Sequence, residues 1–205
     1  MADALNNPAH RLVLASKSAS RAAVLRGAGL TFEQITAGVD EESIKASLRV
    51  EGASCAKQAD ILAETKALKV SISHHGVILG ADQMLDLEGE AFDKPADREE
   101  AREHLKKLRG KTHILQTALV ACVEGVAVWR HLAQPRLRMR NFSDEFLEAY
   151  LDQTVPDILT SVGGYQLEGR GAQLFERIEG DYFSILGLPL LPLLQWLRDR
   201  GTIPA

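Results

Sequence analysis

The segment VILGADQMLDLEGEAFDKP, residues 77–95, is the stretch on which the expected fold depends. Its first three residues are apolar and predict a buried strand, and Gly80 lets the backbone approach a neighbouring segment just before Asp82. Residues 88–90 (EGE) predict a turn, after which the chain returns toward Lys94. If this hairpin closes, Asp82 and Lys94 lie near one another.

A carboxylate and a cation at the edge of a sheet suit metal-assisted chemistry on phosphates. One group can hold Mg²⁺ or activate water while the other neutralises developing negative charge. A surface salt bridge beside a turn is the alternative interpretation of Asp82 and Lys94. The two residues alone do not decide between these interpretations.

The composition is that of a soluble globular protein. The chain has 205 residues, of which 45% are apolar and 25% charged, and no apolar run approaches the length of a transmembrane helix. The start of the chain, residues 1–11, has no signal-peptide pattern, so we expect a cytoplasmic protein that does not bind membranes. A net charge of -4 argues against a partner such as duplex nucleic acid, but a local cluster of cations could still bind a small anion.

Neither the cysteines nor the histidines form a metal-binding pattern. Cys55 lies in a helical pattern and Cys122 in a strand pattern, without metal-ligand spacing, and both are predicted to be buried thiols in a reducing compartment. His74 and His75 precede a glycine in an expected loop and are predicted to face solvent.

A second candidate phosphate site lies near the start of the chain. Residues 11–16 predict a short strand, and Ser18 is a plausible N-cap for a helix that extends to about residue 28. The N-terminus of a helix offers backbone N–H groups to an anion, and Lys17 and Arg21 would add positive charge. An ordinary capped helix remains the alternative.

The rest of the chain predicts alternating helices and strands. In residues 53–70, apolar side chains recur at helical spacing, with Lys57 and Lys66 on other faces, and this helix should pack under the strand that begins at Val77. The other expected elements are a strand at 30–36, an acidic loop at 38–42 that could supply a metal ligand or be merely solvated, a helix starting at 97–100, strands at 113–123, 126–132 and 136–140, and helices from 143 to 153 and after 189.

The glycine-rich segment 163–171 has too many glycines for a regular strand. It is expected to be a loop pressed against a ligand or another backbone, or else a flexible surface loop.

Several of these stretches together resemble the Maf family of nucleotide pyrophosphatases, sometimes called septum-formation inhibitor proteins. No single motif is specific, but their order and spacing extend from about Leu12 to Gly201. The matching motifs are LASKSASR at 14–21, VDE at 39–41, GADQ at 80–83, DKP at 93–95, GGYQLEG at 163–169 and GDYFSILGLPL at 180–190.

The resemblance implies an α/β fold similar to the inosine triphosphate pyrophosphatases. Such a fold has an elongated mixed sheet, helices on its outer sides and a cleft between two lobes, here within a single Maf-like domain at 1–205. The resemblance also implies hydrolysis of a nucleoside triphosphate to a monophosphate and pyrophosphate with a divalent metal cation, Mg²⁺ or Mn²⁺. A homodimer is expected.

The resemblance further assigns roles to residues of this chain. Asp82 would take the catalytic carboxylate role, and Glu41 would lie with it near the metal, while Lys94 would meet the phosphates. The substrate-binding residues would be Ser16, Ser18, Arg21, Lys66, Gln83, Gln166 and Glu168.

The chain departs from the family where substrate preference is concerned. The family usually has Ser-Pro-Arg-Arg where this chain has SASR at 18–21, which argues against a preference for dTTP or UTP. GADQ at 80–83 and LEGRGAQLFERIEG at 167–180 look more like the branch that acts on 7-methyl-GTP, whereas GGY at 163–165 and GDYFS at 180–184 resemble the other branch. We therefore expect modified or non-standard nucleotides and a house-cleaning role. The alternative is a catalytically weak nucleotide-binding regulator of cell division that acts through a partner.

Overall fold

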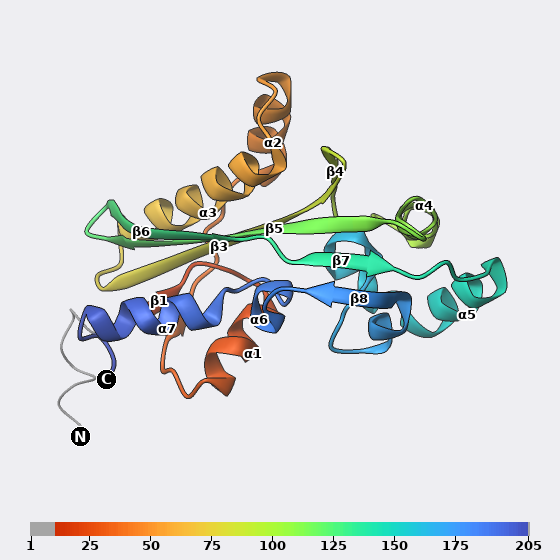
Figure 1. Ribbon diagram of the computed structural model, residues 1–205. Coiled ribbons are helices and arrows are strands. Elements are labelled where there is room, and N and C mark those ends of the chain that lie inside the picture. Colours follow the sequence, from red (N-terminus) through yellow and green to blue (C-terminus); the bar gives the residue numbers. More distant parts are fainter. Residues whose placement is uncertain (1–10, 205) are drawn as a thin grey trace.

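The computed structural model describes residues 11–204 and shows a mixed α/β protein (Figure 1). The described chain forms an eight-stranded sheet with the strand order β2-β1-β3-β5-β7-β8, while β4 pairs with β3 and β6 pairs with β5. Helices cover both faces, so the α/β class and the mixed sheet are confirmed. Residues 1–10, which include most of the segment examined for a signal peptide, lie outside the described residues.

The elements follow one another in this order: β1 (Leu12–Leu14), α1 (Ala19–Gly27), β2 (Glu33–Gln34), α2 (Glu41–Val50), α3 (Cys55–Ser71), β3 (Val77–Leu87), β4 (Glu90–Phe92), α4 (Arg98–Leu108), β5 (Thr112–Val123), β6 (Val126–Ala133), β7 (Arg136–Met139), α5 (Asp144–Thr154), the short 3₁₀ turns η3 (Asp157–Thr160), η4 (Val162–Gly164) and η5 (Arg170–Leu174), β8 (Phe175–Glu179), α6 (Tyr182–Ile185) and α7 (Leu190–Asp199).

Strand β3 lies inside the sheet, and its side chains alternate between two apolar layers. Ile78 and Met84 pack with small residues of α3 on one face. Leu79 and Ala81 pack on the other face with α1 and α7. Because alternate residues of a strand point to opposite faces, one apolar run supplies both layers. The expected packing of the 53–70 helix under this strand is confirmed (Figure 1).

Gly80 brings β3 into direct contact with the backbone of α3. A Cβ atom at this position would lie 2.1 Å from the carbonyl oxygen of Ala63 and 2.7 Å from the backbone nitrogen of Ala67. The close approach predicted from the sequence is therefore an approach to a helix. It places α3 directly beside Asp82, two residues further along the strand.

One edge of β3 is left open between two short partners. β1 pairs with residues 77–79 and β4 with residues 85–87, so residues 80–84 have no partner strand on that side in the described chain. On the other side, β5 pairs with β3 continuously from Ile78 to Asp86. The gap between β1 and β4 therefore leaves the middle of β3, residues 80–84 with Asp82 at their centre, without a strand partner on this side.

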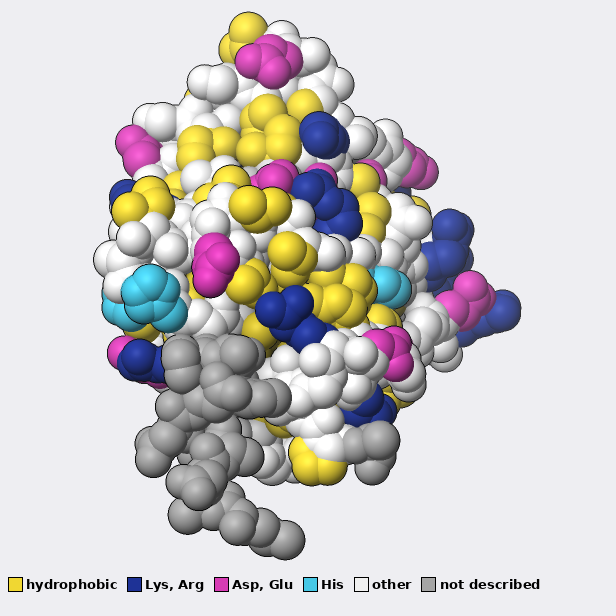
Figure 2. All heavy atoms as spheres, turned by 90° about the vertical axis from the view of Figure 1, so that its left-hand side faces the viewer, with side chains coloured by type: hydrophobic (Ala, Val, Ile, Leu, Met, Phe, Trp, Pro, Cys, Tyr) yellow, Lys and Arg dark blue, Asp and Glu magenta, His cyan; other side chains and the backbone are white. Residues whose placement is uncertain are grey.

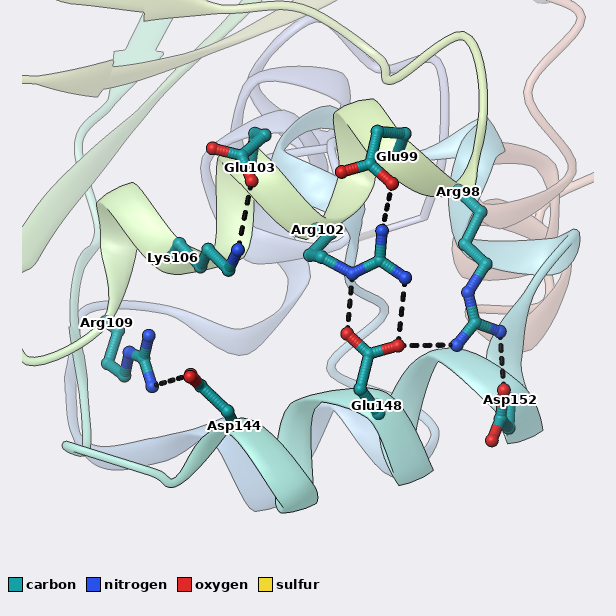
Figure 3. Close-up of polar contacts among 9 residues, drawn as sticks. All are labelled: Arg98, Glu99, Arg102, Glu103, Lys106, Arg109, Asp144, Glu148 and Asp152. Atoms are coloured by element: carbon teal, nitrogen blue, oxygen red, sulfur yellow. Dashed lines mark hydrogen bonds and ion pairs between the residues drawn. The ribbon is translucent and has the colours of Figure 1, made fainter.

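A third apolar layer lies where α4 and α5 meet the glycine-rich segment. The expected stripe of α4, Ala101, Leu105 and Leu108, is fully buried in this layer. A ladder of ion pairs links the outer surfaces of the two helices, and Glu148 of α5 accepts hydrogen bonds from both Arg98 and Arg102 of α4 (Figure 3). These bonds hold the pKa of Glu148 at about 2, well below its ordinary value.

Three expectations about local structure were wrong. The strand expected at 30–36 contains only Glu33–Gln34. The acidic loop expected at 38–42 comprises only residues 38–40, because α2 begins at Glu41, where the Asp40 side chain caps the helix by accepting the backbone N–H of Ser43 at 3.1 Å. Lys66 does not lie on an outer face of α3, since it is only 6% exposed.

Cys55 and Cys122 are buried and unpaired, as predicted. None of the helices within residues 11–204 is long and apolar enough to cross a membrane.

Exposed apolar side chains occur on β6, at Val126, Val128 and Leu132. The end of the molecule that lies at the left in Figure 1 is turned toward the viewer in Figure 2, where hydrophobic side chains gather among basic ones. The expected homodimer stays a prediction.

A buried histidine predicts how stability depends on pH. His113 on β5 is fully buried, and its Nε2 lies 2.7 Å from the Tyr165 hydroxyl. Burial lowers the pKa of His113 from 6.5 to about 4. Because the folded state resists protonation of His113, this histidine contributes to the free energy of unfolding on the order of 3 kcal/mol. The contribution is complete above pH 6.5 and is lost as the pH falls toward 4.

The measurement is urea unfolding of the wild type and of His113→Leu at pH 7 and pH 5. The wild type should lose about 2 kcal/mol more than the variant over this interval. Exposed His75 provides the matched control, and His75→Gln should keep the wild-type pH dependence. Equal pH slopes in wild type and His113→Leu would contradict the prediction.

Candidate active site

The open edge of β3 leads into a cavity with a volume of about 750 Å³. Its walls come from the segment after β1 and the start of α1, from α2 and α3, from the segment after β4, and from the glycine-rich segment and the residues after α6. The cavity lining includes every site residue predicted from the sequence: Ser16, Ser18, Arg21, Glu41, Lys66, Asp82, Gln83, Lys94, Gln166 and Glu168.

Asp82 pairs with Lys66. Asp82 Oδ1 lies 2.7 Å from Lys66 Nζ, and both side chains are 7% exposed. Glu41 Oε1 lies 3.0 Å from the same ammonium group. Burial raises the pKa of Glu41, but the charge and hydrogen bond of Lys66 outweigh it, so the pKa lies below its ordinary value. The second oxygen of Asp82, Oδ2, is buried and has no hydrogen-bond partner among the described residues.

The hairpin does not bring Lys94 into an ion pair with Asp82. Its ladder ends at the pair Leu85–Phe92. Continuing that register by three residues would place Pro95 opposite Asp82, and proline has no N–H to extend a ladder. Lys94 instead reaches the cavity from the chain beyond β4. The sequence predicted only that Asp82 and Lys94 lie near one another, and both residues line this cavity.

Lys94 is an exposed cation with no ion-pair partner among residues 11–204. Partial desolvation by the surrounding protein lowers the pKa of Lys94, and the like charge of Arg21 acts in the same direction. Glu41 opposes this shift. A lysine in this state is available to an anionic ligand.

The start of α1 forms the second cationic wall. Ser18 caps the helix by accepting the backbone N–H of Arg21 at 3.3 Å, which confirms the predicted cap. The Arg21 side chain donates from Nη1 to Ser16 Oγ at 3.2 Å and from Nε to the carbonyl of Gly187 at 2.9 Å. Its guanidinium is therefore held in a fixed orientation. Burial lowers the pKa of Arg21, and the charges of Asp82 and Glu41 oppose this shift.

The glycine-rich segment closes the cavity as a folded loop with two 3₁₀ turns. A Cβ atom at Gly171 would lie 2.3 Å from the backbone oxygen of Gln166, so the loop is pressed against its own backbone. The Gln166 side chain donates to the carbonyl of Asp157 at 3.2 Å. Of the alternatives for this segment, contact with another backbone is therefore confirmed.

Comparison with known proteins identifies the family. The family described as Maf-like protein matches residues 11–200. The chain belongs to the Maf family. A curated relative from Hyphomonas neptunium, named nucleoside triphosphate pyrophosphatase, is 52% identical over 193 residues, which cover 94% of this chain and 98% of the relative. A relative of the same name from Paramagnetospirillum magneticum is 52% identical over 93% of this chain and 99% of its own length. Another from Caulobacter vibrioides is 46% identical over 94% and 96%.

Gln83 lines the cavity of this Maf protein, but its amide nitrogen is used by the protein itself. It donates to Thr117 Oγ1 at 2.8 Å and to the backbone carbonyl of Ser184 at 3.0 Å. Because these bonds hold the chain of α6 against the sheet, Gln83 positions the wall that carries Gly187. Its assignment as a substrate-binding residue, which came from the family resemblance, stays a prediction.

Lys45 is a cavity-lining cation that the sequence reasoning missed. It lies on α2, and its Nζ is 2.8 Å from Oδ1 of Asp93. The interpretation of residues 38–42 as a loop left the helical spacing that points to Lys45 unrecognised. Once Asp40 is recognised as a helix cap, Glu41 and Lys45 are four residues apart and share one helical face.

The site has only part of a metal-binding set. No three His, Cys, Asp or Glu side chains within residues 11–204 gather as a candidate metal site. Asp82 and Glu41 nevertheless meet at Lys66, and the buried Asp82 Oδ2 lacks a partner among those residues. The carboxylate oxygens are hard donors of the kind that Mg²⁺ prefers.

Proposed function

We propose that this protein is a metal-dependent nucleoside triphosphate pyrophosphatase that removes modified or non-standard nucleotides from the nucleotide pool. The curated relatives that match almost the whole chain are named nucleoside triphosphate pyrophosphatase. The observation that carries the proposal is the buried oxygen of Asp82, which has no hydrogen-bond partner within residues 11–204, in a cavity that Arg21 and Lys94 also line. This arrangement suits the cleavage of a polyanion.

A divalent cation fits the donor set at Asp82 and Glu41. Mg²⁺ is often bound through one or two carboxylates together with substrate phosphates, so an incomplete protein set is sufficient once the triphosphate is present. The bound cation would supply charge stabilisation on phosphate oxygens and lower the pKa of bound water. The choice between Mg²⁺ and Mn²⁺ is part of the test below.

Some residues of the chain would act on the phosphates, and others would contact the nucleobase. Water adds across the bond between the α- and β-phosphates, so that the products are a nucleoside monophosphate and pyrophosphate. Asp82 accepts a proton through Oδ2, and Lys94 and Arg21 face the negative charge that spreads over the phosphate oxygens. Apolar cavity residues such as Leu115 and Ile185 are suited to the face of a nucleobase.

The test is pyrophosphate release from a panel of nucleoside triphosphates that includes dTTP, UTP and 7-methyl-GTP, with Mg²⁺ or Mn²⁺. Turnover that requires the metal is expected, and the preferred base identifies the branch of the family. Nucleotide-dependent thermal stabilisation without turnover would instead support the nucleotide-binding regulator.

Replacing Lys94 by alanine should weaken both substrate binding and turnover. Because Lys94 is an exposed residue without an ion-pair partner among the described residues, its replacement breaks no ion pair there and should leave the melting temperature almost unchanged. The loss of one phosphate-facing cation should lower kcat/KM by about a hundredfold. Steady-state pyrophosphate release measures this.

Lys107→Ala is the matched control for Lys94→Ala. Lys107 of α4 pairs with Glu90 next to the turn of the same hairpin, and it does not line the cavity. Its replacement should leave kcat/KM within about twofold of wild type, as expected for a surface pair. If both variants lost activity equally, the assignment of Lys94 to the phosphates would be wrong.

A further inference from the structure

Helix α2 is held to the rest of the protein mainly by charged contacts. Of its residues only Leu48 is buried, and Val50 is 90% exposed. In Figure 1 the helix stands away from the sheet, beyond α3. A helix with so little buried apolar surface is not fixed by packing alone. Its position must therefore depend strongly on its polar contacts.

Asp93 provides two of those contacts. Its Oδ1 lies 2.8 Å from Lys45 Nζ and its Oδ2 lies 2.6 Å from a guanidinium nitrogen of Arg49. Lys45 and Arg49 are four residues apart, so they leave α2 on one face and reach the same carboxylate. Burial raises the pKa of Asp93, but the hydrogen bonds from Lys45 and Arg49 outweigh it and leave the pKa below its ordinary value.

The same helix face carries Glu41 at its first turn, 3.0 Å from Lys66. Asp93, in turn, directly precedes Lys94. The contacts of Asp93 thus connect the helix that carries one cavity carboxylate to the segment that carries a cavity cation. Leu48 is the one residue of α2 that is buried.

We propose that Asp93 is a positioning residue that clamps α2 over the cavity through Lys45 and Arg49, and thereby places Glu41 beside Lys66 and Asp82. The proposal rests on the proposed function only for its effect on turnover. Its structural part, the docking of α2, stands on the contacts alone. When the contacts of Asp93 with Lys45 and Arg49 are broken, Glu41 moves away from Asp82, with which it would hold the metal ion. Lys45 then moves away from the cavity wall.

The first experiment compares amide hydrogen exchange in Asp93→Asn, Asp93→Glu and the wild type. Asp93→Asn keeps the shape but removes the charge, so the amides of α2 should exchange about tenfold faster while those of α3 and β3 keep their wild-type rates. Asp93→Glu should recover much of the protection because it restores the charge. Unchanged exchange in α2 of Asp93→Asn would overturn the clamp.

The second experiment measures the Mg²⁺ concentration that gives half-maximal pyrophosphate release. Groups that orient metal ligands typically change metal affinity by about 10–100-fold when removed, so Asp93→Asn should need at least about tenfold more Mg²⁺. Combining Asp93→Asn with Lys45→Met and Arg49→Met should add little further loss, because all three changes break the same clamp. A normal Mg²⁺ requirement despite fast exchange in α2 would overturn the positioning role.

Glu90→Gln is the matched control, since it removes a carboxylate of the same hairpin that pairs with Lys107 of α4 instead of α2. It should change neither the exchange of α2 nor the Mg²⁺ requirement, and an equal effect of Glu90→Gln would overturn the clamp. If the wild type released no pyrophosphate, the proposed function would fail. Faster exchange confined to α2 in Asp93→Asn would still support the clamp in that case.

Discussion

Replacing Asp82 by asparagine is expected to lower pyrophosphate release by about a thousandfold. The neutral amide has no charge with which to hold a cation, and it can no longer accept a proton at the position of Oδ2. That oxygen has no hydrogen-bond partner among the described residues, as the proposed role requires. Steady-state release with saturating Mg²⁺ and Mn²⁺ measures the loss.

The same variant should also be less stable, because Asp82 is a buried partner of Lys66. Removing one member of a buried ion pair costs about 3–5 kcal/mol when the other charge is left alone. Glu41 remains 3.0 Å from Lys66, so the loss should fall below that range. Activity is therefore measured at a temperature where circular dichroism shows the variant folded.

Asp86→Asn is the control for Asp82→Asn. Asp86 lies four residues further along β3 on the same face, and its carboxylate accepts hydrogen bonds from Gly89 and Gln116 outside the cavity. This variant should keep wild-type turnover. Wild-type turnover in a folded Asp82→Asn protein would exclude Asp82 as the catalytic carboxylate.

Replacing Gly80 by alanine is expected to destabilise the fold by at least about 3 kcal/mol. The new Cβ atom would lie 2.1 Å from the carbonyl oxygen of Ala63 and 2.7 Å from the backbone nitrogen of Ala67, so α3 would have to move off the strand. That movement would also carry Lys66 away from Asp82. Urea unfolding followed by circular dichroism measures the loss of stability.

Two further variants make the test of Gly80 specific. Gly27, the last residue of α1, has open space where a Cβ atom would go, so Gly27→Ala should change stability by less than about 1 kcal/mol. Adding Ala67→Gly to Gly80→Ala should not restore stability, because the shortest contacts are with backbone atoms. Wild-type stability of Gly80→Ala would show that α3 does not lie against β3 as described.

Local patterns in the sequence predicted most of the elements. The apolar run at 77–79, the cap at Ser18 and the hairpin turn each depend on residues that are close along the chain. The same patterns, together with the family motifs, identified a set of residues that all line one cavity. The acidic segment 38–42 shows the limit of such patterns, since a solvated loop and a capped helix start with the same residue types.

The sequence by itself therefore determined the α/β class, the strand that carries Asp82 and ten of the residues that line the cavity. Only the tertiary structure decided which charged side chains form ion pairs with one another. Lys66 pairs with Asp82 because Gly80 lets α3 touch β3, and Lys45 pairs with Asp93 across 48 residues of sequence. Such pairings depend on strand register and helix docking, which are set by the packing of distant segments and have no local signature.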